Sequence, residues 1–252
     1  MDASERRGCF TSARASGGRA WWAARHARRI ARDARLVGLG EVDPGLALRL
    51  LAELAAPSRD GGDLKVRLVA QPDRDGAPCL RGGAISLAPD PAAWRAITAP
   101  APHPGPSPTS AAKTTDRAYY DAALAAARNA GADEALCLDA CGRLVEGCRT
   151  NLVVVLADGA LATPPLARGA QAGIAREILL ERCAELGERD VDRASLAAAR
   201  EVVAVNAVRG ARAVVALDGA PVGDGRPGPW SVRLGDALGR RAASRRRAKS
   251  MR

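Results

Sequence analysis

Lysine is rare in this chain, and one lysine stands where it could do chemistry. Of the 38 basic residues, three are lysine, namely Lys65, Lys113 and Lys249, and the other 35 are arginine. A guanidinium stays protonated and forms no Schiff base, whereas a lysine amine in a dehydrated site can lose its proton and attack a carbonyl. Lys65 and Lys249 fit ordinary roles as a strand cation and a tail cation. Lys113 is therefore the candidate nucleophile.

Two further features lie downstream of Lys113 and suit the same chemistry. Glu146 stands at the end of an expected strand in the segment GRLVEG, and GIAREILLE continues from Gly173 as an expected helix. The first backbone N–H groups of a helix have no partners inside the helix, so they can bind a phosphate. Either feature alone is weak, because a strand-end glutamate is more often a surface residue and a glycine before a helix is usually only a turn. Together with the amine, they would suit an aldehyde cofactor that carries a phosphate.

Several short motifs occur in an order that resembles one enzyme family. They are K-T-T-D-R (113–117), A-D-E-A-L (132–136), G-R-L-V-E-G-C-R-T-N-L (142–152), L-A-T-P-P-L (161–166) and A-G-I-A-R (172–176), with R-G-C-F-T-S-A-R (7–14) and H-A-R-R-I (26–30) upstream and V-N-A-V-R-G (205–210) downstream. The pattern resembles the class IV pyridoxal-phosphate enzymes of fold type IV, which include branched-chain and D-amino-acid transaminases and 4-amino-4-deoxychorismate lyases. The resemblance covers about residues 7–225 and implies that pyridoxal 5′-phosphate is the cofactor.

The resemblance implies roles for three charged residues. Lys113 would be the catalytic lysine, which holds the cofactor as a Schiff base and shuttles protons. Glu146 would pair with the pyridine nitrogen and keep it protonated. Arg29 matches the arginine of the family's H-x-x-R-L helix, so it would hold the phosphate through its bidentate fork. His26 and Arg29 are three residues apart and therefore share a helical face, although the spacing alone also fits an ordinary basic helix.

The resemblance also implies a second group of contacts around the phosphate and the substrate. The backbone amides of Ile174 and Ala175 would bind the phosphate, together with the turn at Ala207. Relatives usually carry a hydroxyl residue at both alanine positions, so the amides would remain here without those hydroxyl groups. Asn206 and Arg209, in the same turn as Ala207, are the candidates for contacts with the substrate.

The expected fold is α+β with two domains, resembling D-amino-acid aminotransferases. We expect a small N-terminal α/β domain over residues 1–98, a proline-rich linker over 99–112, a larger cofactor-binding domain over 113–238 and a basic tail over 239–252. The cofactor would lie at the domain interface. Prolines at 100, 102, 104, 106 and 108 exclude helix and central strand from the linker, and His103 within it is expected to be exposed.

Local patterns predict the individual elements. Strands are expected where apolar and polar residues alternate, and helices where apolar residues recur at helical spacing. Hairpins are expected where a Gly-containing turn separates two apolar runs. The expected strands are 9–15, 63–71 and 84–88, the helices 20–37, 46–56 and 117–131, and the hairpins 132–147 and 151–164. The two hairpins would carry Glu146 and Asn151 toward a common edge.

Composition and charge narrow the function classes. The net charge is +10, but the run GRRAASRRRAKSMR at 239–252 carries much of it, as a solvated tail would. A nucleic-acid-binding module is the alternative that this run suggests, yet aromatic residues do not interleave with the basic ones, so no specific nucleic-acid partner is expected. No apolar run reaches about 18 residues, and the sequence opens with MDASERRG instead of an apolar leader. A cytoplasmic protein without membrane partners is expected.

The six cysteines are expected to be unlinked thiols packed as small apolar groups. Cys137 and Cys141 have a spacing that suits zinc poorly, and neither histidine is nearby in the sequence, so no metal is expected.

Within the family, the motifs GCFTSAR and KTTDR are more similar to those of the lyases, and Ala118 stands where branched-chain transaminases often have tyrosine. The resemblance therefore favours 4-amino-4-deoxychorismate lyase, which eliminates pyruvate and leaves 4-aminobenzoate for folate synthesis. An amino-acid transaminase, acting on branched-chain or D-amino acids, is the alternative. Either reaction takes a small amino substrate, and a homodimer is expected because relatives are dimers.

Overall fold

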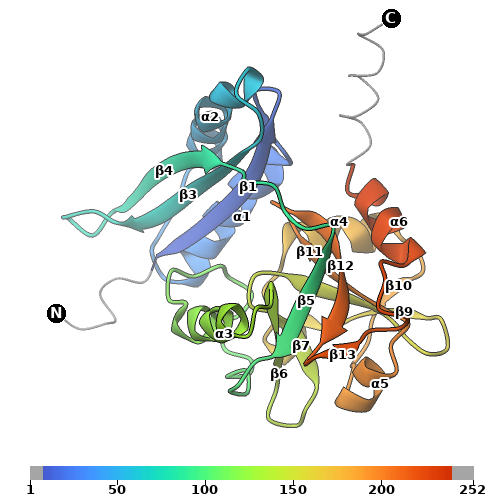
Figure 1. Ribbon diagram of the computed structural model, residues 1–252. Coiled ribbons are helices and arrows are strands. Elements are labelled where there is room, and N and C mark those ends of the chain that lie inside the picture. The colour runs from blue at the N-terminus through green and yellow to red at the C-terminus, as the bar shows by residue number, and fades with distance from the viewer. Residues whose placement is uncertain (1–7, 240–252) are drawn as a thin grey trace, which may run out of the picture. The chain divides into compact units, whose positions relative to one another are not determined.

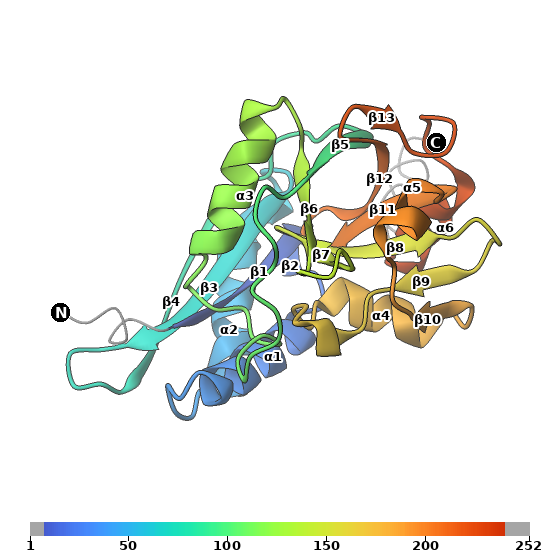
Figure 2. The same cartoon turned by 90° about the horizontal axis from the view of Figure 1, so that it is seen from below.

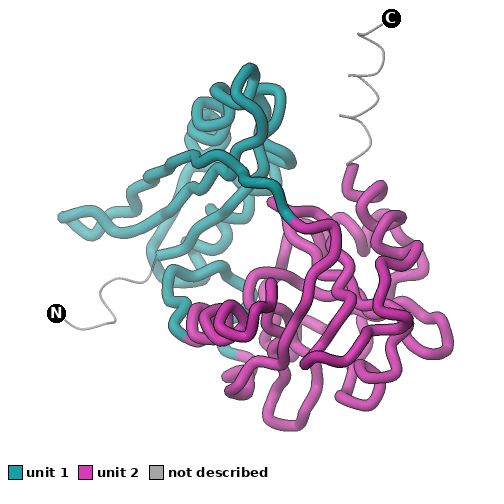
Figure 3. Tube along the Cα trace, in the orientation of Figure 1, with its two compact units in different colours: residues 1–90, 107–118 teal, residues 91–106, 119–252 magenta. Residues whose placement is uncertain are grey.

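The computed structural model describes residues 8–239, and these divide into two compact units (Figure 3). Unit 1 comprises residues 8–90 and 107–118, and unit 2 comprises residues 91–106 and 119–239. The units are therefore interleaved along the chain, since each is built from two separate segments. In the described part of the chain, no helix has both the length and the apolar character needed to cross a bilayer.

Unit 1 is built on an antiparallel sheet with the strand order β2-β1-β3-β4 (Figure 1). Its strands are β1 (Cys9–Ser16), β2 (Arg19–Ala20), β3 (Leu64–Pro72) and β4 (Pro78–Ser86). Alternate residues of β3, namely Leu64, Val66, Leu68 and Ala70, are buried. This period of two is what the sequence predicted, because successive strand side chains point to opposite faces.

Two helices cover one face of this sheet, α1 (Ala23–Leu36) and α2 (Pro44–Ala55), and the 3-10 turn η2 (Ala56–Arg59) follows α2 (Figure 2). Asp43 caps α2 by accepting hydrogen bonds from the first backbone amides of the helix. Ile30 and Leu51 bring the two helices into a shared core with the buried residues of β1 and β3. The helices expected in this region and the strands expected at 9–15 and 63–71 are confirmed with shifts of a few residues at their ends, whereas the strand expected at 84–88 overlaps only the last three residues of β4.

Unit 2 contains a second sheet with the strand order β10-β9-β8-β11-β12-β5-β6-β7, and β13 pairs with β12 outside this order. Neighbours pair in parallel at β10–β9, β12–β5 and β5–β6, and antiparallel elsewhere. The strands are β5 (Ala93–Thr98), β6 (Glu134–Leu138), β7 (Leu144–Gly147), β8 (Asn151–Val155), β9 (Leu161–Thr163), β10 (Leu186–Glu188), β11 (Glu201–Asn206), β12 (Gly210–Leu217) and β13 (Ala220–Pro221).

The helices expected at 117–131 and after Gly173 are present as α3 (Ala118–Asn129) and α4 (Ile174–Arg182). Three further helical elements were not expected, namely η3 (Leu166–Arg168), α5 (Arg193–Ala197) and α6 (Pro229–Ala237). The main core of unit 2 joins aliphatic side chains of the sheet with Trp94 of β5. Consecutive buried residues in β6 and β8 show that these strands are covered on both faces.

The segment expected to form the end of the first domain and the linker is divided between the two units. Residues 93–98 form β5, which lies in the second sheet between β12 and β6. Residues 107–118 return to unit 1, where the backbone N–H of Phe10 donates to the carbonyl of Lys113 at 2.8 Å. Long-range strand pairing decides this division, and no local pattern in the sequence records it. Residues 240–252, which include nearly all of the expected basic tail, lie outside the described residues.

His103 is buried, with 5% of its surface exposed, so the expectation of an exposed histidine was wrong. The backbone N–H of His103 donates to the carbonyl of Leu138 at 2.7 Å, which holds this proline-rich segment against β6. Prolines prevent a continuous hydrogen-bonded ladder, but they leave the intervening residues able to bond to a neighbouring strand.

No disulfide joins the six cysteines, all of which lie within residues 8–239. Cys9, Cys137 and Cys148 are buried in the cores, as expected for thiols that pack as small apolar groups, whereas Cys141 is exposed.

Candidate active site

Lys113 lies beside strand β1 of unit 1 and is anchored by its backbone. Thr114 forms an isolated antiparallel bridge with Cys9, and the backbone N–H of Lys113 donates to Oδ2 of Asp33 at 2.9 Å. The Lys113 Nζ atom lies 4.9 Å from the centre of the Phe10 ring. The Phe10 ring face therefore holds the amine in place through a cation–π contact.

Arg29 and His26 lie on the buried face of α1, in the same unit as Lys113. Arg29 is 8% exposed, and its Nη2 atom lies 3.5 Å from the backbone carbonyl of Phe10. Its Nε atom is 3.9 Å from Oδ2 of Asp33, the carboxylate that also receives the Lys113 amide. Asp33 thus connects α1 to the Lys113 segment, and the structure brings Lys113 and Arg29 together.

His26 contributes a buried imidazole to this region. Its Nδ1 atom lies 2.6 Å from Oγ1 of Thr11, and no described residue offers a hydrogen-bond partner to its Nε2 atom. Burial lowers the pKa of His26 well below its usual value, and the positive charges of Arg29 and Lys113 lower it further. The ring is therefore neutral.

The charges in this part of unit 1 suit an anion. The guanidinium groups of Arg29 and Arg32 lie 3.9 and 2.7 Å from the buried Asp33 carboxylate, which also accepts the backbone N–H of Lys113. A group with several acceptor oxygens, such as a phosphate, suits a region so rich in cationic side chains. The residues present therefore fit the phosphate of the expected cofactor.

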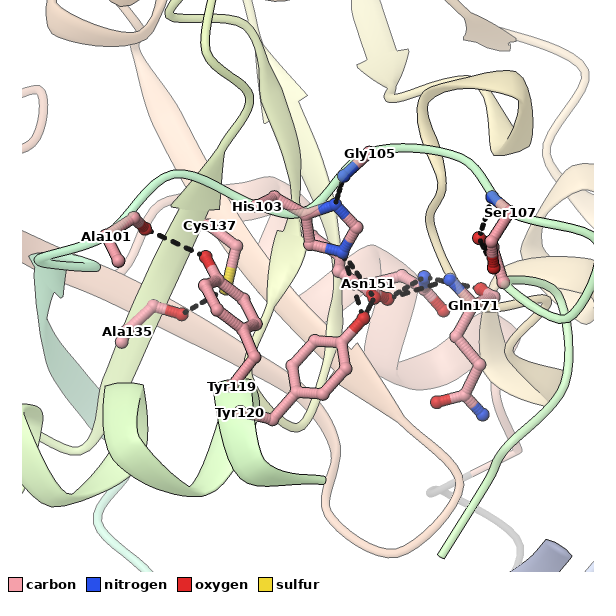
Figure 4. Close-up of polar contacts among 12 residues, drawn as sticks. Ala101, His103, Gly105, Ser107, Tyr119, Tyr120, Ala135, Cys137, Asn151 and Gln171 are labelled. Atoms are coloured by element: carbon pink, nitrogen blue, oxygen red, sulfur yellow. Dashed lines mark hydrogen bonds and ion pairs between the residues drawn. The ribbon is translucent and has the colours of Figure 1, made fainter. Parts of the chain in front are cut away.

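Glu146, at the end of β7 in unit 2, is 3% exposed, and its donors come from Tyr120, Gln171 and Asn151, which are labelled in Figure 4. The Tyr120 hydroxyl donates to its Oε1 at 2.6 Å, and the backbone N–H of Gln171 donates to its Oε2 at 3.0 Å. Asn151 Nδ2 lies 3.5 Å from Oε2. Donors on both oxygens stabilise the negative charge and fix the plane of the carboxylate.

The short loop between β7 and β8 explains why Glu146 and Asn151 meet. The backbone N–H of Gly147 donates to the carbonyl of Thr150 at 2.8 Å, and the Thr150 hydroxyl donates to buried Glu134 at 3.1 Å. Burial raises the pKa of Glu134, while the nearby positive charge of Arg149 opposes the shift. Glu134 anchors the loop from inside β6, and the expectation that the two hairpins bring Glu146 and Asn151 to one edge is confirmed.

The N-terminus of α4 lies against Asn151. The Asn151 Nδ2 atom donates to the carbonyl of Gln171 at 2.9 Å, and a Cβ atom added to Gly173 would lie less than 3.0 Å from Asn151 Oδ1. Glycine at this position therefore lets the helix start approach Asn151 closely. None of the described side chains caps this helix at Gly173, so the amides of Ile174 and Ala175 are not used by a side-chain cap. The helix start is suited to an anion.

The turn after β11 is adjacent to the same edge of the sheet, since Val205 pairs with Asn151 in the β11–β8 ladder. Asn206 Oδ1 accepts the backbone N–H groups of Val208 and Arg209, at 2.9 and 2.7 Å. The Asn206 side chain thus holds the turn that contains Ala207 and Arg209, which is a structural role. A role of Asn206 or Arg209 in binding substrate stays a prediction.

The structure thus assembles the expected residues into two groups. Lys113 and Arg29 belong to unit 1, and Glu146, Ile174, Ala175, Asn206, Ala207 and Arg209 belong to unit 2. Sequence reasoning missed Asp33, His103 and Tyr120. A signal for Tyr120 was present, because the chain has only two tyrosines and two histidines, and scarcity had already singled out Lys113.

Comparison with known proteins places these observations in one family. Residues 8–217 match the family profile described as amino-transferase class IV. Among curated proteins, the branched-chain-amino-acid aminotransferases of Salmonella typhimurium and Escherichia coli are 37% identical over 116 residues. This match covers 44% of the chain and 37% of those relatives.

Solved structures match nearly the whole chain. A hypothetical aminotransferase from Mycobacterium tuberculosis in its PLP-bound form has a TM-score of 0.80 at 22% identity, covering 92% of this chain and 87% of that one. A protein assigned as a 4-amino-4-deoxychorismate lyase from Legionella pneumophila has a TM-score of 0.81 at 21% identity, covering 92% and 90%. The Escherichia coli branched-chain aminotransferase has a TM-score of 0.78 at 22% identity, covering 90% and 82%. These likenesses establish the fold.

Proposed function

This chain belongs to the class IV aminotransferase family, and from that premise we propose that it is a pyridoxal-phosphate enzyme that acts as a 4-amino-4-deoxychorismate lyase. The proposed products are pyruvate and 4-aminobenzoate, a precursor for folate synthesis. The observation that carries the cofactor assignment is the buried carboxylate of Glu146, whose two oxygens accept hydrogen bonds from Tyr120 and Gln171. Hydrogen bonds to both oxygens fix the orientation of this carboxylate, as a partner of a protonated ring nitrogen requires.

When bound, pyridoxal phosphate supplies an aldehyde that condenses with amines and a ring that accepts the electrons released at the substrate α-carbon. The chain's own residues supply the rest. Arg29 and the amides of Ile174 and Ala175 would hold the phosphate. Lys113 Nζ would bond to the aldehyde carbon at rest and, once released by the substrate amine, would take the α-proton. The Glu146 carboxylate would hold a proton at the ring nitrogen, which maintains the ring as an electron acceptor.

One observation favours the lyase activity, and a different one favours the transaminase activity. The motifs GCFTSAR and KTTDR favour the lyase, because they are more similar to those of lyases than to those of transaminases. The 37% identity with branched-chain aminotransferases over 116 residues favours an amino-acid transaminase. The two activities share the first steps and differ in what happens after removal of the α-proton. In a lyase, loss of the α-proton would be followed by departure of the adjacent enolpyruvyl group as pyruvate, which leaves an aromatic ring that still carries the amine. In a transaminase, the proton would be returned at the cofactor side and the amino group would stay on the cofactor.

The first experiment tests the cofactor and the lysine. The purified protein should absorb visible light after addition of pyridoxal phosphate, and borohydride should attach the cofactor to a peptide that contains Lys113. Lys113→Arg should abolish turnover and labelling because a guanidinium forms no imine, whereas the matched variant Lys65→Arg should retain both. A colourless protein, or labelling of the Lys65 peptide, would contradict the assignment.

The second experiment separates the two reactions. With aminodeoxychorismate alone, a lyase accumulates pyruvate and 4-aminobenzoate over many turnovers without a keto-acid acceptor. A transaminase instead converts to the amine form of its cofactor with a single amino acid and recovers with 2-oxoglutarate. If neither 4-aminobenzoate nor pyruvate forms and the second behaviour is seen, the protein is the transaminase. A homodimer is part of the proposal, and sedimentation of the purified protein tests it.

A further inference from the structure

Three side chains of unit 2 form a hydrogen-bonded series, in which His103 and Tyr120 (Figure 4) lie outside the family motifs and Glu146 lies within one of them. His103 comes from the proline-rich segment, Tyr120 from the first turn of α3 and Glu146 from the end of β7. His103 Nε2 lies 3.0 Å from the Tyr120 hydroxyl oxygen, and that hydroxyl lies 2.6 Å from Glu146 Oε1. Three segments that are distant in sequence therefore meet at one carboxylate.

The direction of each hydrogen bond follows from the donors available. The backbone N–H of Gly105 donates to His103 Nδ1 at 3.1 Å, so Nδ1 is an acceptor without a proton. A neutral imidazole has one protonated nitrogen, which places the proton of His103 on Nε2. Nε2–H then donates to the Tyr120 oxygen, and the Tyr120 O–H donates to Glu146. Each group in the series has one direction of donation, and all of them point toward the carboxylate.

The surroundings of His103 keep the imidazole neutral and hold it in place. Burial lowers the pKa of His103, while the more distant charge of Asp139 has the opposite effect. The groups that face the ring are Tyr119, whose ring packs edge-on at 5.5 Å, Tyr120, and Glu146, whose Oε1 is 3.9 Å from Nε2. Tyr119 donates its hydroxyl to the carbonyl of Ala101 at 3.1 Å instead.

We propose that His103 and Tyr120 are positioning residues that fix the orientation and the basicity of the Glu146 carboxylate. The inference rests on the proposed function, in which Glu146 holds a proton at the cofactor's ring nitrogen. The Tyr120 hydroxyl stabilises charge on Oε1 and lowers the tendency of Glu146 to take that proton for itself. His103 restricts rotation of the hydroxyl, so that its proton stays directed at Glu146. Without this series, the proton moves toward the carboxylate and the ring accepts electrons less well.

The first test concerns the protein without cofactor. The chain has two histidines, so ¹⁵N NMR of histidine-labelled protein resolves each ring, and His26→Gln assigns the signals of His103. His103 should be neutral with its proton on Nε2 at about pH 7, where an unperturbed histidine is mostly neutral as well, and the tautomer preference should weaken in Tyr120→Phe. A proton on Nδ1, or an equal mixture of tautomers in the unmodified protein, would overturn the proposal whatever the cofactor does.

The second test uses the two adjacent tyrosines as a matched pair. Tyr120→Phe should lower kcat about 10-fold or more while changing KM little, because one charge-assisted hydrogen bond to Glu146 is lost. It should also shift the pH midpoint of the cofactor's visible band. Tyr119→Phe, which removes a hydroxyl that contacts Ala101, should leave kcat and the band unchanged. Equal effects of the two variants, or no effect of Tyr120→Phe, would refute a positioning role.

A third comparison tests the histidine by rescue. His103→Leu should reproduce the loss of kcat and the band shift of Tyr120→Phe, whereas His103→Gln, which retains an N–H donor near the Tyr120 oxygen, should recover most of the activity. Equal losses in the two variants would show that His103 acts only as a packing residue. If the unmodified protein develops no visible band, the proposed function fails and the catalytic role of the series fails with it. A normal band that Tyr120→Phe leaves unchanged refutes the series alone.

Discussion

Gly173→Ala is the substitution that most directly tests how α4 and Asn151 are held together. The Cβ atom of alanine would lie less than 3.0 Å from Asn151 Oδ1, whereas the backbone dihedral φ of −79° is comfortable for any residue. In the folded protein the substitution therefore acts through the collision and not through backbone strain. Asn151 is 7% exposed and donates to the carbonyl of Gln171 at 2.9 Å, so it cannot move aside without breaking that bond.

The magnitude follows from the two ways in which the collision can be relieved. If Asn151 rotates away, the buried Gln171 carbonyl loses its donor at a cost of about 1–3 kcal/mol. If the helix start moves instead, overpacking costs about 1–3 kcal/mol. Replacing glycine also restricts the unfolded chain, which returns about 0.4–1 kcal/mol. We expect the free energy of unfolding to fall by about 1–2 kcal/mol and cofactor retention to decrease, because the helix start or its neighbour is displaced.

The assay is urea denaturation of matched variants, with retention of the visible band measured on the same samples. Gly187→Ala in β10 is the control, because no atom beyond its chain neighbours lies within 4 Å of its Cβ position, and it should leave stability unchanged or raise it by up to about 1 kcal/mol. In an Asn151→Ala background, Gly173→Ala should cost almost nothing more, since the colliding oxygen is gone. Equal effects of the two glycine variants, or strict additivity of Gly173→Ala with Asn151→Ala, would refute the reasoning.

Further predictions concern the charged groups. Arg29→Ala should weaken cofactor retention about 10-fold to 100-fold, measured by spectral titration, because a charge-assisted phosphate contact is removed. Glu146→Gln should leave the cofactor bound and reduce kcat by at least about 100-fold in steady-state kinetics. If Glu146→Gln loses the cofactor and Arg29→Ala loses only turnover, we have misplaced the two roles. Stability should fall as the pH drops below 6.5, the ordinary histidine pKa, because the unfolded chain binds a proton that buried, neutral His26 does not. His26→Gln should reduce this dependence by about 1.4 kcal/mol per pH unit between about pH 6 and pH 5, and an unchanged slope in urea denaturation would contradict a neutral His26.

The local elements and several of their contacts were predictable from the sequence because short-range chemistry determines them. Alternation in β3, the capping residue Asp43 before α2 and the turn at Asp158 and Gly159 between β8 and β9 each depend on residues a few positions apart. The contact between Glu146 and Asn151 also depends on residues that are close in the sequence. The loop between their strands is short, so two correctly predicted hairpins leave little choice of geometry.

Tertiary structure alone decided which segments share a unit and which polar groups are buried. β5 belongs to the second sheet because it pairs with β12, more than a hundred residues downstream, and the Lys113 segment belongs to unit 1 because it pairs with β1. Five prolines mark residues 99–112 as extended, but exposure depends on what packs against them. His103 is buried because Leu138 and Tyr120, both distant in sequence, come to meet it. A strand's partner and a side chain's solvent exposure are properties of the assembled sheet, so they are absent from any local window of the sequence.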